Sequence, residues 1–320
     1  MTSPKKIRVV IAFGALYIIW GSTYLGIRFA IETIPPFLMA GLRYFSAGLI
    51  MFAIARTQTT LRSNWKEWRT SLIIGACLLL GGNGGVTLSE KYIDSGLAAV
   101  MVATVPIYIA LLSWLRGMAP RPKPVVWLGL AGGFLGVAIL LAPELKFSTS
   151  GDTRPAIGMC ILLVSSFIWS VGSLYSVASK SSASPFVAAA QQMVCGGALL
   201  VLAGVFTGEV GQFHPSMIST LSLGAFVYLV LIGAIVGFTA YIWLLRNCDP
   251  AKVATYAYVN PIVAVLLGAA FAGESVTPRT LLAAALIIGS VALVITAQQL
   301  RSKVKAPPLP AAVPEVGCAR

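Results

Sequence analysis

The stretch Tyr17-Ile18-Ile19-Trp20-Gly21-Ser22-Thr23-Tyr24 lies inside an apolar run that extends from residue 8 to residue 28. A run of about 20 apolar residues is the length at which an α-helix crosses the hydrocarbon core of a bilayer. The related stretch Ile168-Trp169-Ser170 follows 149 residues later, inside a second apolar run from residue 155 to residue 178. The two stretches therefore indicate membrane-spanning segments that recur along the chain.

The composition of the whole chain agrees with a membrane protein. Apolar residues make up 58% of the 320 residues and charged residues only 10%, whereas a soluble domain carries about a quarter charged residues. Inside lipid each backbone polar group must be paired within its own segment, so the apolar runs are predicted to be helices. Ten such runs of spanning length can be marked: 8–28, 36–55, 71–90, 95–115, 124–142, 155–178, 185–206, 220–245, 250–271 and 280–299.

Matching residues divide these ten segments into two copies of five. The dipeptide Pro36-Phe37 recurs as Pro185-Phe186 at the same offset of 149, and from the third segment onward the offset becomes 155, as between Pro106 and Pro261. Because five is odd, the second copy must enter the membrane from the opposite side. Inverted repeats of this kind underlie many secondary transporters, in which the two halves exchange shape around a central site. We expect an N-terminal segment 1–7, repeats at 8–142 and 155–299, and a disordered tail at 300–320.

The distribution of charge predicts the orientation of the spans. With the N-terminus in the cytoplasm, 17 of the 23 Lys and Arg residues fall in cytoplasmic segments and five in outer loops. This asymmetry is typical of the positive-inside rule and places both termini in the cytoplasm. The net charge of +13 is explained in this way, so no nucleic-acid partner is expected.

Several motifs resemble those of one transporter family. They are Tyr17 to Tyr24, Gly41-Leu42-Arg43-Tyr44, Gly82-Asn83-Gly84, Val102 to Pro106, and Tyr256 to Pro261 with Gly273-Glu274. Over about residues 8–300 the chain resembles the EamA-type exporters of the drug/metabolite transporter superfamily, including bacterial exporters of aromatic amino acids. The resemblance implies ten helices in the bacterial inner membrane, with a cavity lined mainly by spans 1, 3, 4, 6, 8 and 9. The Gly-Glu pair is replaced by Met118-Ala119 in the first copy, which argues against a symmetric role for Glu274.

One ionisable residue lies clearly within a span. Arg43 comes seven residues after Pro36, about 10 Å along the helix. It could snorkel to the interface, pair with Glu90 near the outer end of the third segment, or bind a carboxylate of the substrate. The structural pairing is the favoured interpretation, because intramembrane charges are usually paired.

Polar and aromatic residues in the predicted lining segments are the candidates for substrate contact. An amino acid needs hydrogen-bonding groups for its charged ends and an apolar or aromatic wall for its side chain. The candidates are Trp20, Tyr24, Asn83, Thr87, Met101, Trp169, Ser173, Tyr256 and Asn260. For each of them, packing between helices is the alternative role. Pro106 and Pro261 are candidate hinges or static kinks, because a proline frees a carbonyl one turn back.

The sequence predicts a secondary transporter that exports amino acids or similar small metabolites, with membrane lipid as its surroundings and a monomer as a sufficient unit. No carboxylate sits in the middle of a predicted span, which favours a facilitator without built-in proton coupling. A carrier of lipid-linked or nucleotide-sugar substrates is the first alternative, although only Arg43 would meet a phosphate. A membrane receptor or enzyme is the second; no nucleophile–base pair is visible, and no metal site or cofactor is expected.

Overall fold

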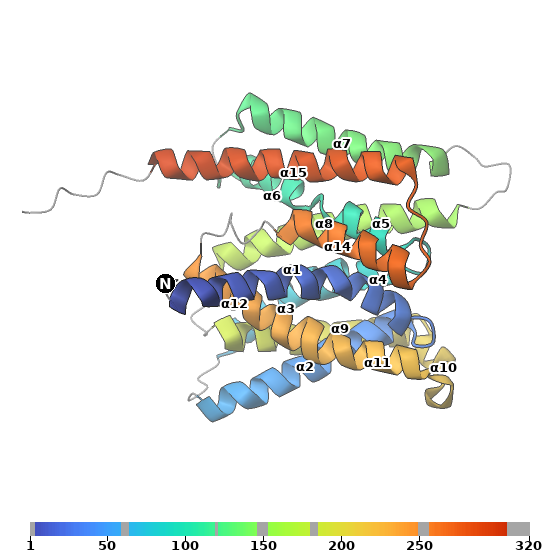
Figure 1. Ribbon diagram of the computed structural model, residues 1–320. Coiled ribbons are helices and arrows are strands. Elements are labelled where there is room, and N and C mark those ends of the chain that lie inside the picture. Colours follow the sequence, from blue (N-terminus) through green and yellow to red (C-terminus); the bar gives the residue numbers. More distant parts are fainter. Residues whose placement is uncertain are drawn as a thin grey trace, which may run out of the picture.

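The computed structural model describes residues 4–58, 64–118, 121–145, 153–179, 185–248 and 256–305, and no strand occurs within these ranges. Their helices run roughly side by side in one bundle (Figure 1). Seven of the described helices are long and apolar enough to cross a membrane, and three shorter apolar stretches begin at Pro124, Val259 and Pro278. The predicted all-α membrane fold of ten spans is thereby confirmed.

The first repeat contains spans one to five. Spans one and two are α1 (Pro4–Ala30) and α2 (Pro36–Gln58). The third span is continuous but changes its winding, from α3 (Trp65–Gly75) through the π-helical η1 (Ala76–Gly84) to α4 (Gly85–Ser89). The fourth is broken into α5 (Ser95–Val102) and α6 (Val105–Leu115), and the fifth is α7 (Pro124–Leu145).

The second repeat has the same plan. It begins with α8 (Arg154–Ala178) and α9 (Pro185–Phe206), which the short helices α10 (Glu209–Gln212) and η2 (Pro215–Met217) follow. The eighth span joins α11 (Thr220–Tyr228), the π-helical η3 (Leu229–Val236) and α12 (Gly237–Asn247). Spans nine and ten are α14 (Tyr256–Phe271) and α15 (Pro278–Lys305).

The ends of the predicted repeats differ in detail from the structure. Helix α15 continues to Lys305, six residues beyond the predicted end of the repeat, because residues 300–305 include helix-favouring Leu, Lys and Arg. Helix α1 likewise begins at Pro4 within the predicted N-terminal segment. Residues 306–320 of the predicted tail lie outside the described residues, as do the start of the ninth segment at residue 250 and Asp249, the repeat counterpart of Asp94.

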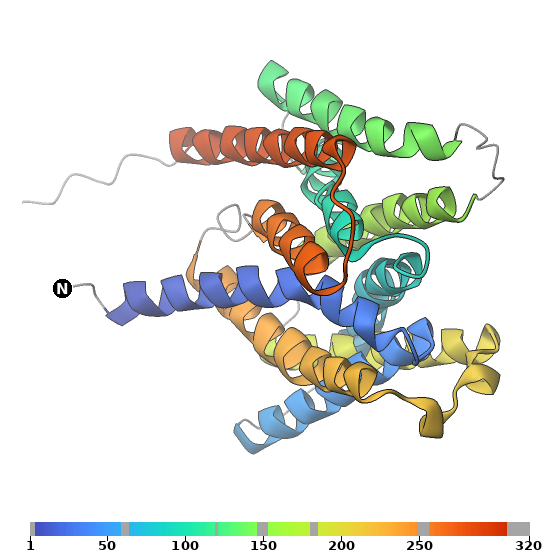
Figure 2. The same ribbon diagram turned by 45° about the vertical axis from the view of Figure 1, so that its right-hand side comes forward.

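Two pairs of equivalent helices hold the repeats together. Helix α2 packs along α9, and α7 packs along α15 at the edge of the bundle (Figures 1 and 2). Glycines allow this approach: a Cβ at Gly48 would stand 2.7 Å from the backbone nitrogen of Val194, and one at Gly136 would stand 2.7 Å from Ile287. The glycines of span five therefore serve internal packing, as small residues do between membrane helices.

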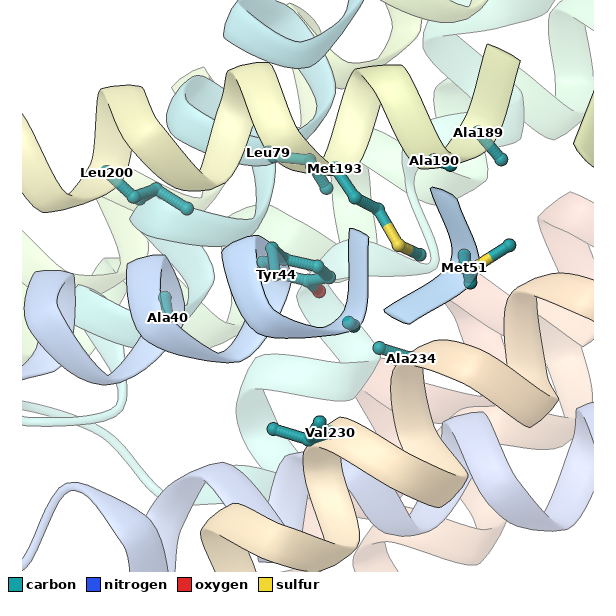
Figure 3. Close-up of a cluster of buried hydrophobic side chains, with 11 residues drawn as sticks. Ala40, Tyr44, Met51, Leu79, Ala189, Ala190, Met193, Leu200, Val230 and Ala234 are labelled. Atoms are coloured by element: carbon teal, nitrogen blue, oxygen red, sulfur yellow. The ribbon is translucent and has the colours of Figure 1, made fainter. Parts of the chain in front are cut away.

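A large buried cluster lies where both repeats meet. Figure 3 shows Tyr44 of α2 beside Leu79 of η1 and Met193 of α9, with Val230 and Ala234 of η3 across from them. Both π-helical segments therefore contribute to this core at equivalent places in the two repeats. Segments of π-helix are rare and are often found at functional sites.

The bundle has two ends that can be told apart. The start of α1 and the end of α15 lie at the same end (Figure 1). The opposite end, called the distal end below, carries α10, η2 and the connections from α4 to α5 and from α14 to α15. An even number of spans requires both ends of the chain to lie on the same side, and the described ends do so.

Candidate functional site

A cavity of about 90 Å³ lies between the two repeats, and it is called the central cavity below. Its walls come from spans one, two, three, four, six, eight and nine. Its aromatic wall consists of Trp20, Tyr24, Tyr44, Trp169, Phe238 and Tyr256. Its polar groups are Thr23, Arg43, Asn83 and Asn260, and its aliphatic residues are Ile27, Val86, Val102 and Val105.

Six of the nine predicted substrate residues line this cavity: Trp20, Tyr24, Asn83, Trp169, Tyr256 and Asn260. The structure thus brings together residues that are up to 240 positions apart in the sequence. Spans one, three, six and nine provide them, as the resemblance implied. Span two is the addition, because Arg43 and Tyr44 both face the cavity.

The other three predicted residues lie elsewhere, for physical reasons. The hydroxyls of Thr87 and Ser173 donate to the carbonyls of Asn83 at 2.9 Å and Trp169 at 2.8 Å, one turn back on their own helices. Such bonds satisfy a hydroxyl inside a helix without a ligand. Met101 is fully buried in an apolar cluster with neighbours such as Leu140 and Met159.

Trp20 anchors the aromatic wall on the side of the first repeat. Its ring lies edge-on to Tyr256 at a centroid distance of 5.1 Å and to Phe238 at 5.5 Å. These tilted arrangements are the favoured ones for aromatic pairs. With its amide nitrogen turned toward α1, Asn260 donates to the carbonyls of Tyr17 at 3.2 Å and Tyr256 at 3.3 Å, so its oxygen is left for other partners.

Arg43 is the cation of the central cavity. Its side chain is only 3% exposed, and its Nε and Nη1 atoms have no hydrogen-bond partner among the described residues. The guanidinium carbon lies 4.7 Å from the ring centroid of its neighbour Tyr44. A buried guanidinium with unused donors is costly, and a carboxylate can accept from it in a bidentate manner. The cavity therefore offers a ready partner for an anionic group.

The predicted pairing of Arg43 with Glu90 is wrong. Glu90 is fully buried, but neither of its carboxylate oxygens accepts a hydrogen bond from any described group, Arg43 included. Glu90 is the last residue of the predicted segment 71–90 and lies one residue beyond the span Trp65–Ser89, a position at which the sequence pattern does not predict burial. The prediction of a facilitator rested on the lack of a carboxylate in the middle of a span; Glu90 lies at the end of one, but it is a buried carboxyl group.

The two candidate hinge prolines have different surroundings. Pro106 is the second residue of α6, directly after the break at Ala103 and Thr104, where the Thr104 hydroxyl donates to the carbonyl of Met101 at 2.7 Å. Pro261 lies inside the unbroken helix α14. The kink is thus present in the fourth span, whereas the equivalent ninth span remains one helix over its described length.

A second, larger cavity of about 230 Å³ opens near the distal end and is called the distal cavity below. Tyr92, Asp94, Gly96, Glu274 and Arg279 are among its lining residues. Burial raises the pKa of Asp94 above its usual value, the charge of Glu274 adds to this, and Arg28 opposes it. The Glu274 carboxylate is already used by backbone donors of α5, so the central cavity, with its unused Arg43, is the better candidate for substrate.

The described residues offer no group of three or more metal-ligating side chains. The groups that the central cavity presents are one guanidinium, two amides, hydroxyls and aromatic faces.

Comparison with known proteins agrees with this arrangement. The model of the EamA-like transporter family matches residues 7–142 and again residues 156–296. The inner membrane transporter YedA of Escherichia coli (strain K12) is 37% identical over 290 residues, which cover 90% of this chain and 91% of that protein. The transporter YvbV of Bacillus subtilis (strain 168) is 27% identical over 92% of this chain and 94% of its own. A crystal structure with 22% identity shares the fold, with a TM-score of 0.62 over 91% of this chain.

Proposed function

Because this chain belongs to the EamA-like transporter family, we propose that it exports amino acids or related zwitterionic or neutral metabolites across the inner membrane by alternating access. That it is a multi-pass membrane transporter follows from the family and from its apolar helices. The substrate class and the mechanism are the proposal.

The observation that carries the proposal is the unsatisfied guanidinium of Arg43 inside an aromatic-walled cavity. A carboxylate on Arg43 would satisfy the buried Nε and Nη1 donors. The ammonium group of the same molecule could be received by the amide oxygens of Asn83 or Asn260 and by the faces of the surrounding rings. Six aromatic side chains would then enclose an apolar substituent.

The size and charge of the cavity favour a small solute. Its volume of about 90 Å³ is well below the roughly 300–1,000 Å³ of pockets that hold drug-sized ligands. A nucleotide sugar would need more space and more cations, and Arg43 is the one cationic side chain in the described lining. One chain lines the central cavity from both repeats, which supports a monomer as a sufficient transport unit.

The symmetry of the fold supports alternating access. Equivalent helices of the two repeats surround one cavity, so an exchange of conformation between the repeats would expose it first on one side and then on the other. The excess of basic residues at the end that holds the chain termini supports a cytoplasmic position for both termini. The distal end would then face outward.

Purified protein in liposomes, tested with a panel of radiolabelled amino acids by counterflow, would test the proposal. We expect saturable exchange of at least one amino acid with an apolar side chain, and its loss in the Arg43→Gln variant. Saturable flux of phosphorylated or cationic solutes alone, with none for any amino acid or other zwitterionic or neutral metabolite, would refute the substrate class. Measurement with and without a pH gradient would show whether protons take part.

A further inference from the structure

Glu90 is a buried carboxyl group without a role in the site described above. It follows α4 directly, and its backbone nitrogen donates to the carbonyl of Val86 at 3.2 Å. Its backbone carbonyl accepts from Nη1 of Arg28 at 2.9 Å. Its side chain, in contrast, is fully buried with both oxygens unpartnered. A buried carboxylate without hydrogen bonds or a paired cation is strongly disfavoured relative to the neutral acid, so the position suits a bound proton.

The same stretch of chain connects the two cavities. Asn83 and Val86, on one side of Glu90, line the central cavity, whereas Tyr92 and Asp94, on the other side, line the distal cavity. At 1.5 Å per residue, Glu90 lies about 6 Å along the chain axis beyond Val86.

Helix α5 runs past both cavities in the same way. Gly96 and Leu97 near its start line the distal cavity, and Val102 at its end lines the central one. Glu90 therefore sits in the wall that separates the two cavities. Lys91, directly after it, is exposed, and Asp94 is the next acidic residue along the chain on the distal side.

Charged and titratable groups from three directions act on the Glu90 carboxyl. Helix α1 contributes Arg28 and the hydroxyl of Tyr24, α2 contributes Arg43, and the connection after α14 contributes Glu274. Burial raises the pKa of Glu90 well above its usual value, and the charge of Glu274 raises it further, whereas Arg28 and Arg43 oppose the increase. The proton affinity of Glu90 thus depends on the charge at Arg43, the residue that faces the central cavity.

We propose that Glu90 is a proton-binding site in the wall between the central and distal cavities, and that it takes up a proton when an anionic group occupies Arg43. An anion bound to Arg43 cancels the positive field that favours an ionised Glu90. The proton and the anion therefore promote the binding of each other, and this coupling is reciprocal. Affinity for an anionic group at Arg43 should increase as the pH falls through the pKa of Glu90. The anion part rests on the proposed function; the proton site does not.

Infrared difference spectroscopy of the full chain in lipid nanodiscs tests the site without any substrate. The C=O stretch of protonated carboxyl groups would be titrated against pH in the wild type and in Glu90→Gln. We expect one carboxyl band that titrates well above the pH usual for glutamate and is absent in Glu90→Gln. Identical titrations of the two proteins would overturn the proton site. Asp94→Asn and Glu274→Gln serve to assign the bands of the neighbouring acids, and both should retain the Glu90 band.

The coupling is tested in the same titration by changing the charge of Arg43. Removal of the cation in Arg43→Gln should move the Glu90 titration upward by about one to three pH units, the usual effect of a nearby opposite charge. Arg43→Lys keeps the charge and should leave the Glu90 titration near its wild-type position, provided that size-exclusion chromatography shows folded protein. A titration that does not move in Arg43→Gln would overturn the coupling. Failure of every amino acid to bind would refute the proposed function, while these titrations would still decide the proton site.

Discussion

Gly82 lies so close to the indole of Trp169 that a Cβ on this glycine would stand 2.6 Å from Cε3 of the ring. In the equivalent pair the glycine comes from the second repeat and the tryptophan from the first: a Cβ at Gly237 would stand 2.5 Å from Nε1 of Trp20. Each repeat thus supplies the glycine that accommodates the tryptophan of the other. Both tryptophans line the central cavity, so these two contacts bring the symmetry of the fold directly into the site.

Alanine at either glycine should therefore disturb the site and not only the packing. In Gly82→Ala and Gly237→Ala the added methyl group must displace an indole, because a contact below 3 Å cannot be tolerated. We expect a loss of about 1–3 kcal/mol in the free energy of unfolding, as is usual for overpacking, together with at least a fivefold lower transport rate. Thermal unfolding and counterflow in liposomes would measure the two effects.

Gly289→Ala in α15 is the matched control, because nothing lies within 4 Å of the Cβ that it would add. It should transport at the wild-type rate. If Gly82→Ala and Gly237→Ala behave like Gly289→Ala, the close contacts between the repeats do not shape the site.

The sequence was sufficient for the fold and for much of the site. Apolar length predicts helices in lipid whatever their neighbours, and the constant offsets of 149 and 155 identify equivalent positions before any contact is known. Trp20 and Trp169 were found in this way, since equivalent positions in an inverted repeat approach one central axis. The polar candidates, such as Asn83 and Asn260, were chosen because they lie in the spans that the family resemblance implied as the cavity lining.

The rest of the site depends on contacts between segments, which no pattern within a single segment predicts. Glu90 comes directly after its span and is fully buried, and the charge of Glu274, far away in the sequence after α14, acts on it. Arg43 faces the cavity without Glu90 as a partner, which depends on how α2 is rotated against α9. Thr87 and Ser173 have the right chemistry in the right spans, but their hydroxyls bond to their own helices, a choice that sequence spacing leaves open.

Glu274 belongs to the second repeat and binds the distal end of the first repeat. Its Oε1 accepts from the backbone nitrogen of Ser95 at 2.8 Å, and its Oε2 accepts from that of Gly96 at 3.0 Å, at the start of α5. A carboxylate at this place satisfies free N–H groups and complements the helix dipole. Its role is therefore capping, which needs no equivalent in the first repeat.

Replacement by Glu274→Gln should weaken both bonds, because the amide can offer only one accepting oxygen and no charge. We expect the free energy of unfolding to fall by about 1–2 kcal/mol, measured as a lower melting temperature in detergent. Glu32→Gln, at an exposed glutamate of the connection between α1 and α2, is the control and should melt like the wild type. Equal melting temperatures for both variants would show that the cap contributes nothing measurable.

Arg43→Gln should lower the affinity for carboxylate-containing substrates by at least tenfold, which corresponds to the loss of one charge-assisted hydrogen bond. Arg43→Lys should recover part of the affinity, because lysine keeps the charge but lacks the planar fork. Competition between a labelled amino acid and its decarboxylated amine would separate recognition of the carboxylate from a general change of the cavity. The affinity for the amine should be the same in the wild type and in Arg43→Gln.

Arg116→Gln is the matched control for this prediction. Arg116 is exposed at the end of α6, away from the residues that line the central cavity. Its variant should bind and transport like the wild type. If the amine and the amino acid lose affinity equally in Arg43→Gln, the guanidinium supports the structure of the cavity and not the carboxylate of the substrate.

Trp169→Ala should impair transport more than any other tryptophan variant outside the first span. The indole lines the central cavity beside Asn83, and its removal deletes a large part of the aromatic wall contributed by the second repeat. An aromatic contact of this kind contributes about 0.5–1.5 kcal/mol beyond the burial of its area, so we expect an increase in KM of at least threefold. Trp127→Ala removes an indole of the same size that is 39% exposed and lies edge-on to Trp114 instead. Ser173→Ala removes a hydroxyl that donates to the carbonyl of Trp169. Both controls should leave KM unchanged, and Asn83→Ala should resemble Trp169→Ala, because it removes a polar group from the same wall. Unchanged kinetics in both Trp169→Ala and Asn83→Ala, with folded protein confirmed by size-exclusion chromatography, would move the substrate site away from the central cavity.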